Sequence, residues 1–338
     1  MPERHRVAVL GGGSFGTVIA NTMACNGNQV ALWLRNPALA ASINERREND
    51  EYLPGYTIDE RVTATLDLSD ALNGIDTVFV AVPSASFRTV VKDVAVQIGP
   101  SVVVVSLTKG IEPGGFHLMS EVLAQELPHN PRAVVSGPNL AREIAAGQLS
   151  ACVSASPDSA VNASIHDLLH SDSFLVYSSS DVYGVELGGA LKNIYAILSG
   201  LCHARDFGEN TIGMVLTRAL AEMSRFAVEL GANPLTFLGL SGVGDLIVTC
   251  STPLSRNYRV GYGLGKGQPL AEVLAGMDQV AEGINTLGLV KAEADRRGVP
   301  MPLVNGLYGI LYEHRPVSEV FSDIMFTEVA RDVEFVAS

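Results

Sequence analysis

The first half of the chain alternates short apolar runs with segments of helical periodicity. Six runs rich in β-branched residues have the length of strands, at residues 7–10, 30–34, 77–82, 102–107, 133–136 and 152–154. This alternation predicts crossover connections and a parallel sheet. Because the run at residues 102–105 is apolar at every position, we expect helices to cover both faces of the sheet.

From about residue 181 the apolar positions follow the 3.6-residue period of amphipathic helices. One such stripe consists of Leu187, Leu191, Ile194, Tyr195 and Leu198. The change of period predicts an α/β, doubly wound domain over residues 1–183. It predicts an all-α C-terminal domain over residues 184–338.

Composition and charge narrow the possible partners. The chain has 338 residues, of which 47% are hydrophobic and 17% charged, and its net charge is −13. This balance repels nucleic-acid backbones and anionic membranes, and Lys192 interrupts the longest apolar stretch. We therefore expect no nucleic-acid partner and no stable membrane insertion, and a phosphate-bearing ligand would need a local basic site.

The cysteines favour a reducing compartment. Cys25, Cys152, Cys202 and Cys250 are widely spaced and form no CxxC pair or other zinc-type cluster. The apolar run near the start is too short for a signal peptide. We expect a cytoplasmic protein without a metal site.

A glycine motif lies between the first expected strand and the helix that follows. Gly11, Gly13 and Gly16 form a GxGxxG pattern, which in this context is typical of a Rossmann-type, dinucleotide-binding turn. Its amides and the helix dipole would bind a pyrophosphate. The alternative is a glycine-rich turn without a ligand.

Arg35 follows the second expected strand, where NAD-binding members of this fold carry an acid. A guanidinium at this place suits a 2′-phosphate, so we expect NADP to be accepted at least as well as NAD. The alternative is an ordinary solvated surface arginine.

Three loops that follow strands should meet at the same rim of the sheet, at residues 81–84, 108–110 and 136–139. Lys109 brings positive charge to this rim, where it could orient an oxygen-rich substrate. The alternative is a surface lysine beside a turn.

Lys192 lies in a helix with unusual glycines. Gly188 and Gly189 precede it by one turn and Ala196 follows by one turn, so that face of the helix carries little bulk. A ligand could approach the ammonium closely, which suits a general acid or base. The alternative is a snorkelling lysine whose glycines serve helix packing.

Two further segments favour anion binding. Asp245 lies at a glycine-flanked turn, and Ser255, Arg256 and Asn257 place a hydroxyl, a guanidinium and an amide in succession. Arginine with neighbouring donors can hold a phosphate monoester. Alternatively, Ser241 and Asp245 serve only a helix N-terminus.

Taken together, six ordered blocks resemble the bacterial NAD(P)-dependent glycerol-3-phosphate dehydrogenase family. The resemblance runs from about residue 5 to residue 330, and its blocks are GGGSFGT at 11–17, SLTKGIE at 106–112, SGPNLARE at 136–143, GGALKN at 188–193, LSGVGDLIVTC at 240–250 and SRNYRVG at 255–261.

The resemblance implies an enzyme that catalyses reversible hydride transfer between C4 of the nicotinamide and C2 of sn-glycerol 3-phosphate or dihydroxyacetone phosphate. This reaction feeds glycerophospholipid synthesis, and a cytoplasmic homodimer is implied. Besides the glycines, the implied NAD or NADP contacts are Ser14, Phe15, Arg35, Tyr52, Lys109, Ala141, Arg256, Val280 and Glu282. The implied substrate contacts are Lys109, Gly137, Asn139, Lys192, Asp245, Ser255, Arg256 and Asn257, with Lys192 as the proton donor or acceptor.

Phe15 and Asn139 depart from the family pattern, which often has Trp or Tyr and Ser or Thr at these places. Two other classes of protein stay open. A ketopantoate or 3-hydroxyacyl reductase would share the first domain but would not need the anion cluster at residues 255–257. A nucleotide-sensing regulator would bind NAD(P)H without turnover and would not need Lys192.

Overall fold

The computed structural model describes residues 5–277 and 281–326. They form two compact units. The first unit contains the chain up to Glu112 together with His117–Val182, and the second contains Pro113–Phe116 together with the chain from Tyr183 onward. The roles assigned above to residues 1–183 and 184–338 remain predictions.

The first unit is built around one large sheet. Its strands are β1 (Arg6–Leu10), β2 (Gln29–Trp33), β5 (Val62–Thr65), β6 (Thr77–Val80), β7 (Val103–Ser106), β8 (Arg132–Ser136), β9 (Ser150–Ala155) and β10 (Phe174–Ser179). A separate hairpin consists of β3 (Glu48–Asn49) and β4 (Leu53–Thr57). The helices are α1 (Ser14–Cys25), α2 (Pro37–Ala41), the π-helical turn η1 (Ser42–Arg46), α3 (Leu68–Leu72), α4 (Ser84–Ala95), α5 (Met119–Glu126), α6 (Ala141–Ala145) and α7 (Ser159–Leu169).

The strand order in the large sheet is β10-β9-β8-β7-β6-β1-β2-β5. The six expected strands are all present, and β5 and β10 add the two edges. The sheet is parallel as expected except at one pair of strands, since β9 runs antiparallel to β8. The connection between these two strands contains only the five-residue α6, which is shorter than the helices that usually cover a parallel crossover.

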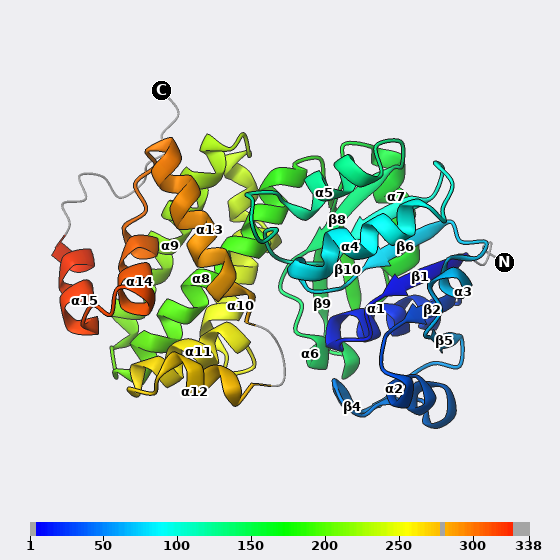
Figure 1. Cartoon of the computed structure of the whole chain (residues 1–338), viewed down its shortest axis with the longest axis horizontal. Coiled ribbons are helices and arrows are strands. Elements are labelled where there is room, and N and C mark those ends of the chain that lie inside the picture. The colour runs from blue at the N-terminus through cyan, green and yellow to red at the C-terminus, as the bar shows by residue number, and fades with distance from the viewer. Residues whose placement is uncertain (1–4, 278–280, 327–338) are drawn as a thin grey trace. The chain divides into compact units, whose positions relative to one another are not determined.

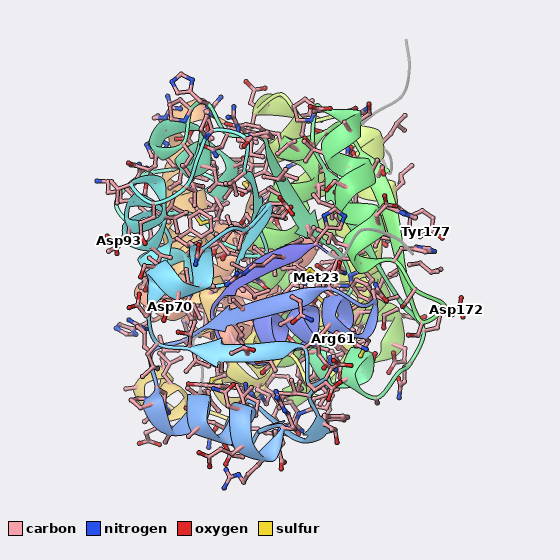
Figure 2. All side chains as sticks on the ribbon, turned by 90° about the vertical axis from the view of Figure 1, so that its right-hand side faces the viewer. Met23, Arg61, Asp70, Asp93, Asp172 and Tyr177 are labelled. Atoms are coloured by element: carbon pink, nitrogen blue, oxygen red, sulfur yellow. The ribbon has the colours of Figure 1, made fainter. Side chains whose placement is uncertain are left out.

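Both faces of the sheet are covered, as the doubly wound prediction requires (Figure 1). In β1, Val7 and Val9 join one buried core with residues of α1 and α7. Ala8 and Leu10 point to the opposite face and join a second core with residues of α4 and α5. Figure 2 shows Met23 of α1 in the packed interior and Asp93 at the periphery. This two-sided burial explains why the strands read as continuous apolar runs.

Helices connected by loops make up the second unit, and its described residues include no strand. Its elements are α8 (Val182–Ala204), α9 (Glu209–Glu229), the short turns η2 (Pro234–Leu238) and η3 (Leu240–Gly244), α10 (Asp245–Ser251), α11 (Arg256–Gly265), α12 (Leu270–Ala275), α13 (Glu282–Arg297), α14 (Pro302–Tyr312) and α15 (Val317–Phe326). This agrees with the all-α prediction. None of the described helices combines the length and apolarity needed to cross a membrane.

Helices α8 and α11 touch along their backbones. A Cβ atom at Gly261 would lie 1.7 Å from the Ile197 carbonyl oxygen, and one at Gly200 would lie 2.0 Å from that of Tyr258. Both positions therefore require glycine. This close approach brings the start of α11, which contains the predicted anion cluster, against the middle of α8, which contains Lys192.

Candidate functional site

The glycine turn of the first unit accepts no side chain at two of its three motif positions. Gly11 has φ +126°, and a Cβ atom there would lie 2.4 Å from the Ala81 carbonyl oxygen. A Cβ atom at Gly16 would lie 2.0 Å from the carbonyl oxygen of Gly11. These glycines let β1, α1 and the end of β6 approach each other closely, as the motif predicts.

The third motif glycine leaves open space. Gly13 is the N-cap residue of α1, no side chain caps the helix, and a Cβ atom at Gly13 would meet no atom within 4 Å. The first amides of α1 and the positive end of its dipole therefore border unfilled volume. This arrangement fits the pyrophosphate of a dinucleotide.

The β3–β4 hairpin is hydrogen-bonded to this glycine turn. The Asn49 amide is buried, and its Nδ2 donates to the Gly12 carbonyl at 2.9 Å and to the Thr17 hydroxyl at 2.8 Å. Its Oδ1 accepts from the Tyr52 amide at 2.9 Å. The Ser14 hydroxyl donates to the Tyr52 carbonyl at 2.8 Å. Sequence reasoning missed Asn49, because nothing local marks a residue 37 positions from Gly12.

Two other predicted coenzyme contacts flank the turn. Phe15 is partly buried and packs against the core shared by β1 and α7. Arg35 lies two residues beyond β2 and is exposed. A hydrogen bond with Glu51, then partial burial, raises the pKa of Tyr52, and the nearby charge of Arg35 opposes this shift. Arg35, Glu51 and Tyr52 therefore lie close together.

The rim at the ends of β7 and β8 contains the remaining predicted residues of the first unit. Lys109 Nζ donates to the Gly137 carbonyl at 2.7 Å. Asn139 Nδ2 donates to the Ala151 carbonyl at 3.0 Å. Among the described residues, the buried atoms Asn139 Oδ1 and Ser136 Oγ have no hydrogen-bond partner in the structure. A bound polar ligand would satisfy such atoms. Ala141, predicted as a coenzyme contact, begins α6 on the same loop.

In the second unit, Lys192 is buried in a polar triad. Its side chain is 7% exposed and forms an ion pair with Asp245, whose side chain is 1% exposed. Lys192 Nζ also donates to Thr249 Oγ1 at 2.9 Å, and that hydroxyl donates to Asp245 Oδ1 at 3.1 Å. The carboxylate stabilises the protonated ammonium. Asp245 is the first residue of α10. Its side chain forms the ion pair with Lys192 and does not cap the helix.

The sequence left open whether Lys192 is a snorkelling lysine and whether its neighbouring glycines serve only helix packing; the structure answers these two questions differently. Lys192 does not snorkel, because it is buried and paired. Gly188, in contrast, serves packing: a Cβ atom there would lie 2.3 Å from the Ser241 carbonyl oxygen. Glycine is therefore required at residue 188 because the backbone of Ser241 packs against it, and not because a ligand needs the space.

The predicted anion cluster is organised around the start of α11. The Ser255 hydroxyl caps the helix by accepting from the Tyr258 amide at 3.3 Å. Asn257 Nδ2 donates to Asn193 Oδ1 at 2.9 Å, and Asn257 Oδ1 accepts from the Gly283 amide at 3.0 Å. Asn257 thereby ties α11 to α8 and α13, directly beside Lys192.

Arg256 is the cation of this cluster. Burial lowers the pKa of its guanidinium, Arg259 lowers it further, and the negative charge of Glu282 opposes both effects. Glu282 is the first residue of α13, so two predicted coenzyme contacts lie near each other. A third, Val280, lies outside the described residues. The structure thus gathers Lys192, Asp245 and residues 255–257 within one unit.

Sequence reasoning missed Asn193 and Thr249. Thr249 lies four residues after Asp245 and therefore on the same helical face, a spacing that could have indicated it. Asn193 is adjacent to Lys192 in the chain, but only the packing of α11 shows that its amide bonds to Asn257.

Comparison with known proteins gives one consistent family. Residues 6–162 match the model for the NAD-dependent glycerol-3-phosphate dehydrogenase N-terminus, and residues 181–322 match the model for its C-terminus. A curated relative from Alcanivorax borkumensis, named glycerol-3-phosphate dehydrogenase, NAD(P)+, is 51% identical over 98% of this chain and 97% of its own length. One from Pseudomonas fluorescens with the same name is 52% identical over 100% of this chain and 95% of its own length.

The structural comparison agrees. The crystal structure of glycerol-3-phosphate dehydrogenase from Coxiella burnetii superimposes with a TM-score of 0.92 at 34% identity, covering 96% of this chain and 99% of that one.

Proposed function

This chain belongs to the NAD-dependent glycerol-3-phosphate dehydrogenase family, and we propose that it interconverts dihydroxyacetone phosphate and sn-glycerol 3-phosphate. NAD(H) or NADP(H), when bound at the glycine turn, would supply the redox chemistry, the transfer of a hydride to or from C2. The observation that carries this proposal is the buried Lys192–Asp245–Thr249 triad. A protonated ammonium held away from water in this way is suited to proton exchange with the C2 oxygen.

Lys192 is the general acid in the direction of reduction. Its ammonium donates a proton to the developing alkoxide at C2, and in oxidation the neutral amine takes the proton back. Asp245, which the resemblance implies as a substrate contact, would act through Lys192: its carboxylate is paired with the ammonium and orients it before the reaction. Thr249, which contacts both groups, limits the rotation of the lysine side chain.

The phosphate of the substrate binds at the start of α11. Arg256 supplies the charge, and Ser255 and Asn257 complete the set of donors with the first amides of the helix. Because the Asn257 side chain is bonded at both ends, it contributes mainly by holding Arg256 in place. Lys109, Gly137 and Asn139 contribute the further polar contacts to substrate.

The coenzyme binds along the glycine turn. Gly13 would leave room for the pyrophosphate, and Gly11 and Gly16 would allow the tight turn that presents the amides. Ser14, Phe15, Tyr52 and Ala141 would hold the coenzyme, and Arg35 would contact its adenosine ribose. Lys109, Arg256, Val280 and Glu282 complete the proposed coenzyme contacts. The open volume at Gly13 and the uncapped start of α1 support this assignment.

The product supplies glycerophospholipid synthesis, and we place the enzyme in the cytoplasm as a homodimer. All four cysteines are free thiols, which accords with a reducing compartment. Sedimentation of the purified protein tests the dimer.

The activity is tested by following NADH and NADPH absorbance after addition of dihydroxyacetone phosphate. We expect oxidation of the coenzyme and formation of sn-glycerol 3-phosphate. Coenzyme binding without turnover would instead favour a nucleotide-sensing regulator. Turnover of ketopantoate or a 3-oxoacyl thioester in preference to dihydroxyacetone phosphate would favour another reductase class.

A further inference from the structure

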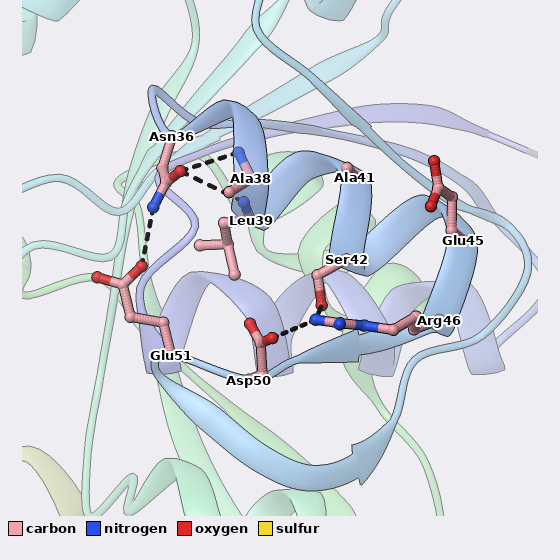
Figure 3. Close-up of a pocket in the computed structure, with 9 residues that line it drawn as sticks. All are labelled: Asn36, Ala38, Leu39, Ala41, Ser42, Glu45, Arg46, Asp50 and Glu51. Carbon is pink, nitrogen blue, oxygen red and sulfur yellow. Dashed lines mark hydrogen bonds and ion pairs between the residues drawn. The ribbon is translucent and has the colours of Figure 1, made fainter.

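A cavity of about 370 Å³ lies beside the segment that follows β2 (Figure 3). Helix α2 and the turn η1 form one side of it, and residues 50 and 51 form the other. Its charged lining residues are Glu45, Arg46, Asp50 and Glu51. Arg46 is paired with Asp50, so the lining contains two further carboxylates that this guanidinium does not neutralise.

Glu51 is held at one edge of the cavity by Asn36. Asn36 Nδ2 donates to Glu51 Oε2 at 3.0 Å. The other end of the same amide is also occupied, because Asn36 Oδ1 accepts from the amides of Ala38 at 3.0 Å and Leu39 at 3.3 Å. Figure 3 shows both sets of bonds. The orientation of Asn36 is therefore determined by the start of α2, and Asn36 in turn positions the carboxylate.

This position has a known meaning in dinucleotide-binding folds. The adenosine ribose lies at the end of the second strand, where an acid binds the 2′-hydroxyl of NAD or an arginine accommodates the 2′-phosphate of NADP. Here the segment after β2 supplies Arg35, while the acid comes from the β3–β4 hairpin. Tyr52, the next residue, contacts the glycine turn through Ser14, which places Glu51 next to the coenzyme loop.

We propose that Glu51 sets the coenzyme preference of this enzyme: its carboxylate accepts a hydrogen bond from the ribose 2′-hydroxyl of NAD(H) and repels the 2′-phosphate of NADP(H). Arg35 acts in the opposite sense. The opposed charges of the two residues explain how one site accepts both coenzymes. This inference rests on the proposed function for its coenzyme class, but it concerns binding and not turnover.

The test is equilibrium titration of the full-length protein with NADH and with NADPH, followed by fluorescence without substrate. Glu51→Gln keeps a hydrogen-bond acceptor and removes the charge. We expect the affinity for NADPH relative to NADH to rise about tenfold, the size expected for removing one charge at close range. NADH binding should change by less than about twofold, and Arg35→Gln should shift the ratio in the opposite direction.

Glu45→Gln is the matched control, because it removes the same charge from the same cavity without disturbing the bond to Asn36. Added salt should shrink the shift caused by Glu51→Gln, since screening weakens charge repulsion. An unchanged ratio in the Glu51 variant would overturn the inference, as would an equal shift in the Glu45 variant or a wild type that binds neither coenzyme. Normal coenzyme binding without turnover of dihydroxyacetone phosphate would sink only the proposed function.

Discussion

Replacement of Lys192 by alanine removes the proposed acid and leaves Asp245 buried without its cation. We expect kcat to fall by about 10² or more, the usual contribution of a positioned general acid. Coenzyme affinity should stay close to wild type, because Lys192 is not one of the proposed coenzyme contacts and the glycine turn belongs to the other compact unit. The reduction of dihydroxyacetone phosphate therefore loses its proton donor and keeps its hydride donor.

The same substitution also costs stability. Removing one partner of a buried ion pair typically lowers the unfolding free energy by about 3–5 kcal/mol, out of a total of about 5–15 kcal/mol for a protein. Here the Asp245 side chain is 1% exposed, so the upper part of this range applies. Loss of activity must therefore be separated from loss of fold.

A double variant makes this separation. Lys192→Met with Asp245→Asn removes both charges and keeps similar volumes, so most of the stability should return while kcat stays low. Steady-state kinetics at saturating coenzyme, together with thermal unfolding, measure the two effects. The mechanism would be refuted if folded Lys192→Ala kept kcat within about threefold of wild type, or if the double variant regained turnover.

Three further outcomes follow from the structure. Burial raises the pKa of Glu222 from 4.5 to about 7. Between these two pKa values the folded state holds a proton that the unfolded state has released. The unfolding free energy should therefore fall by about 3 kcal/mol as the pH rises from the lower pKa to the higher one. Urea titrations across that range should show the decline, and Glu222→Gln should flatten it. Gly13→Ala should fold normally, because a Cβ atom has room there, and should bind coenzyme at least about tenfold more weakly. Gly16→Ala should unfold more readily, because a Cβ atom at Gly16 would clash with backbone. Thermal melts and coenzyme titrations compare the two variants. Asn49→Ala should lower the unfolding free energy by about 2–3 kcal/mol by removing two buried hydrogen bonds and one partly buried one. Stability close to wild type in denaturant would contradict this role of Asn49.

Local features of the chain were enough to predict much of this protein. The strand runs, the change to helical period near residue 181 and the glycine turn each depend on residues within one or two elements, because side-chain period and backbone freedom are local properties. The pattern Gly11-x-Gly13-x-x-Gly16 predicted a strand–turn–helix unit, and the close contacts at Gly11 and Gly16 supply its physical reason.

Only the tertiary structure decided which distant polar groups meet. Lys192 and Asp245 are 53 residues apart, and they pair because the turn η3, which leads directly into α10, packs on α8 in the space that Gly188 leaves. Asn49 reaches the glycine turn from a separate hairpin, and β9 runs antiparallel to β8 although the alternation of strands and helices predicted a parallel sheet. Sequence spacing cannot specify such contacts, since they depend on how whole elements pack and on which buried polar groups then find a partner.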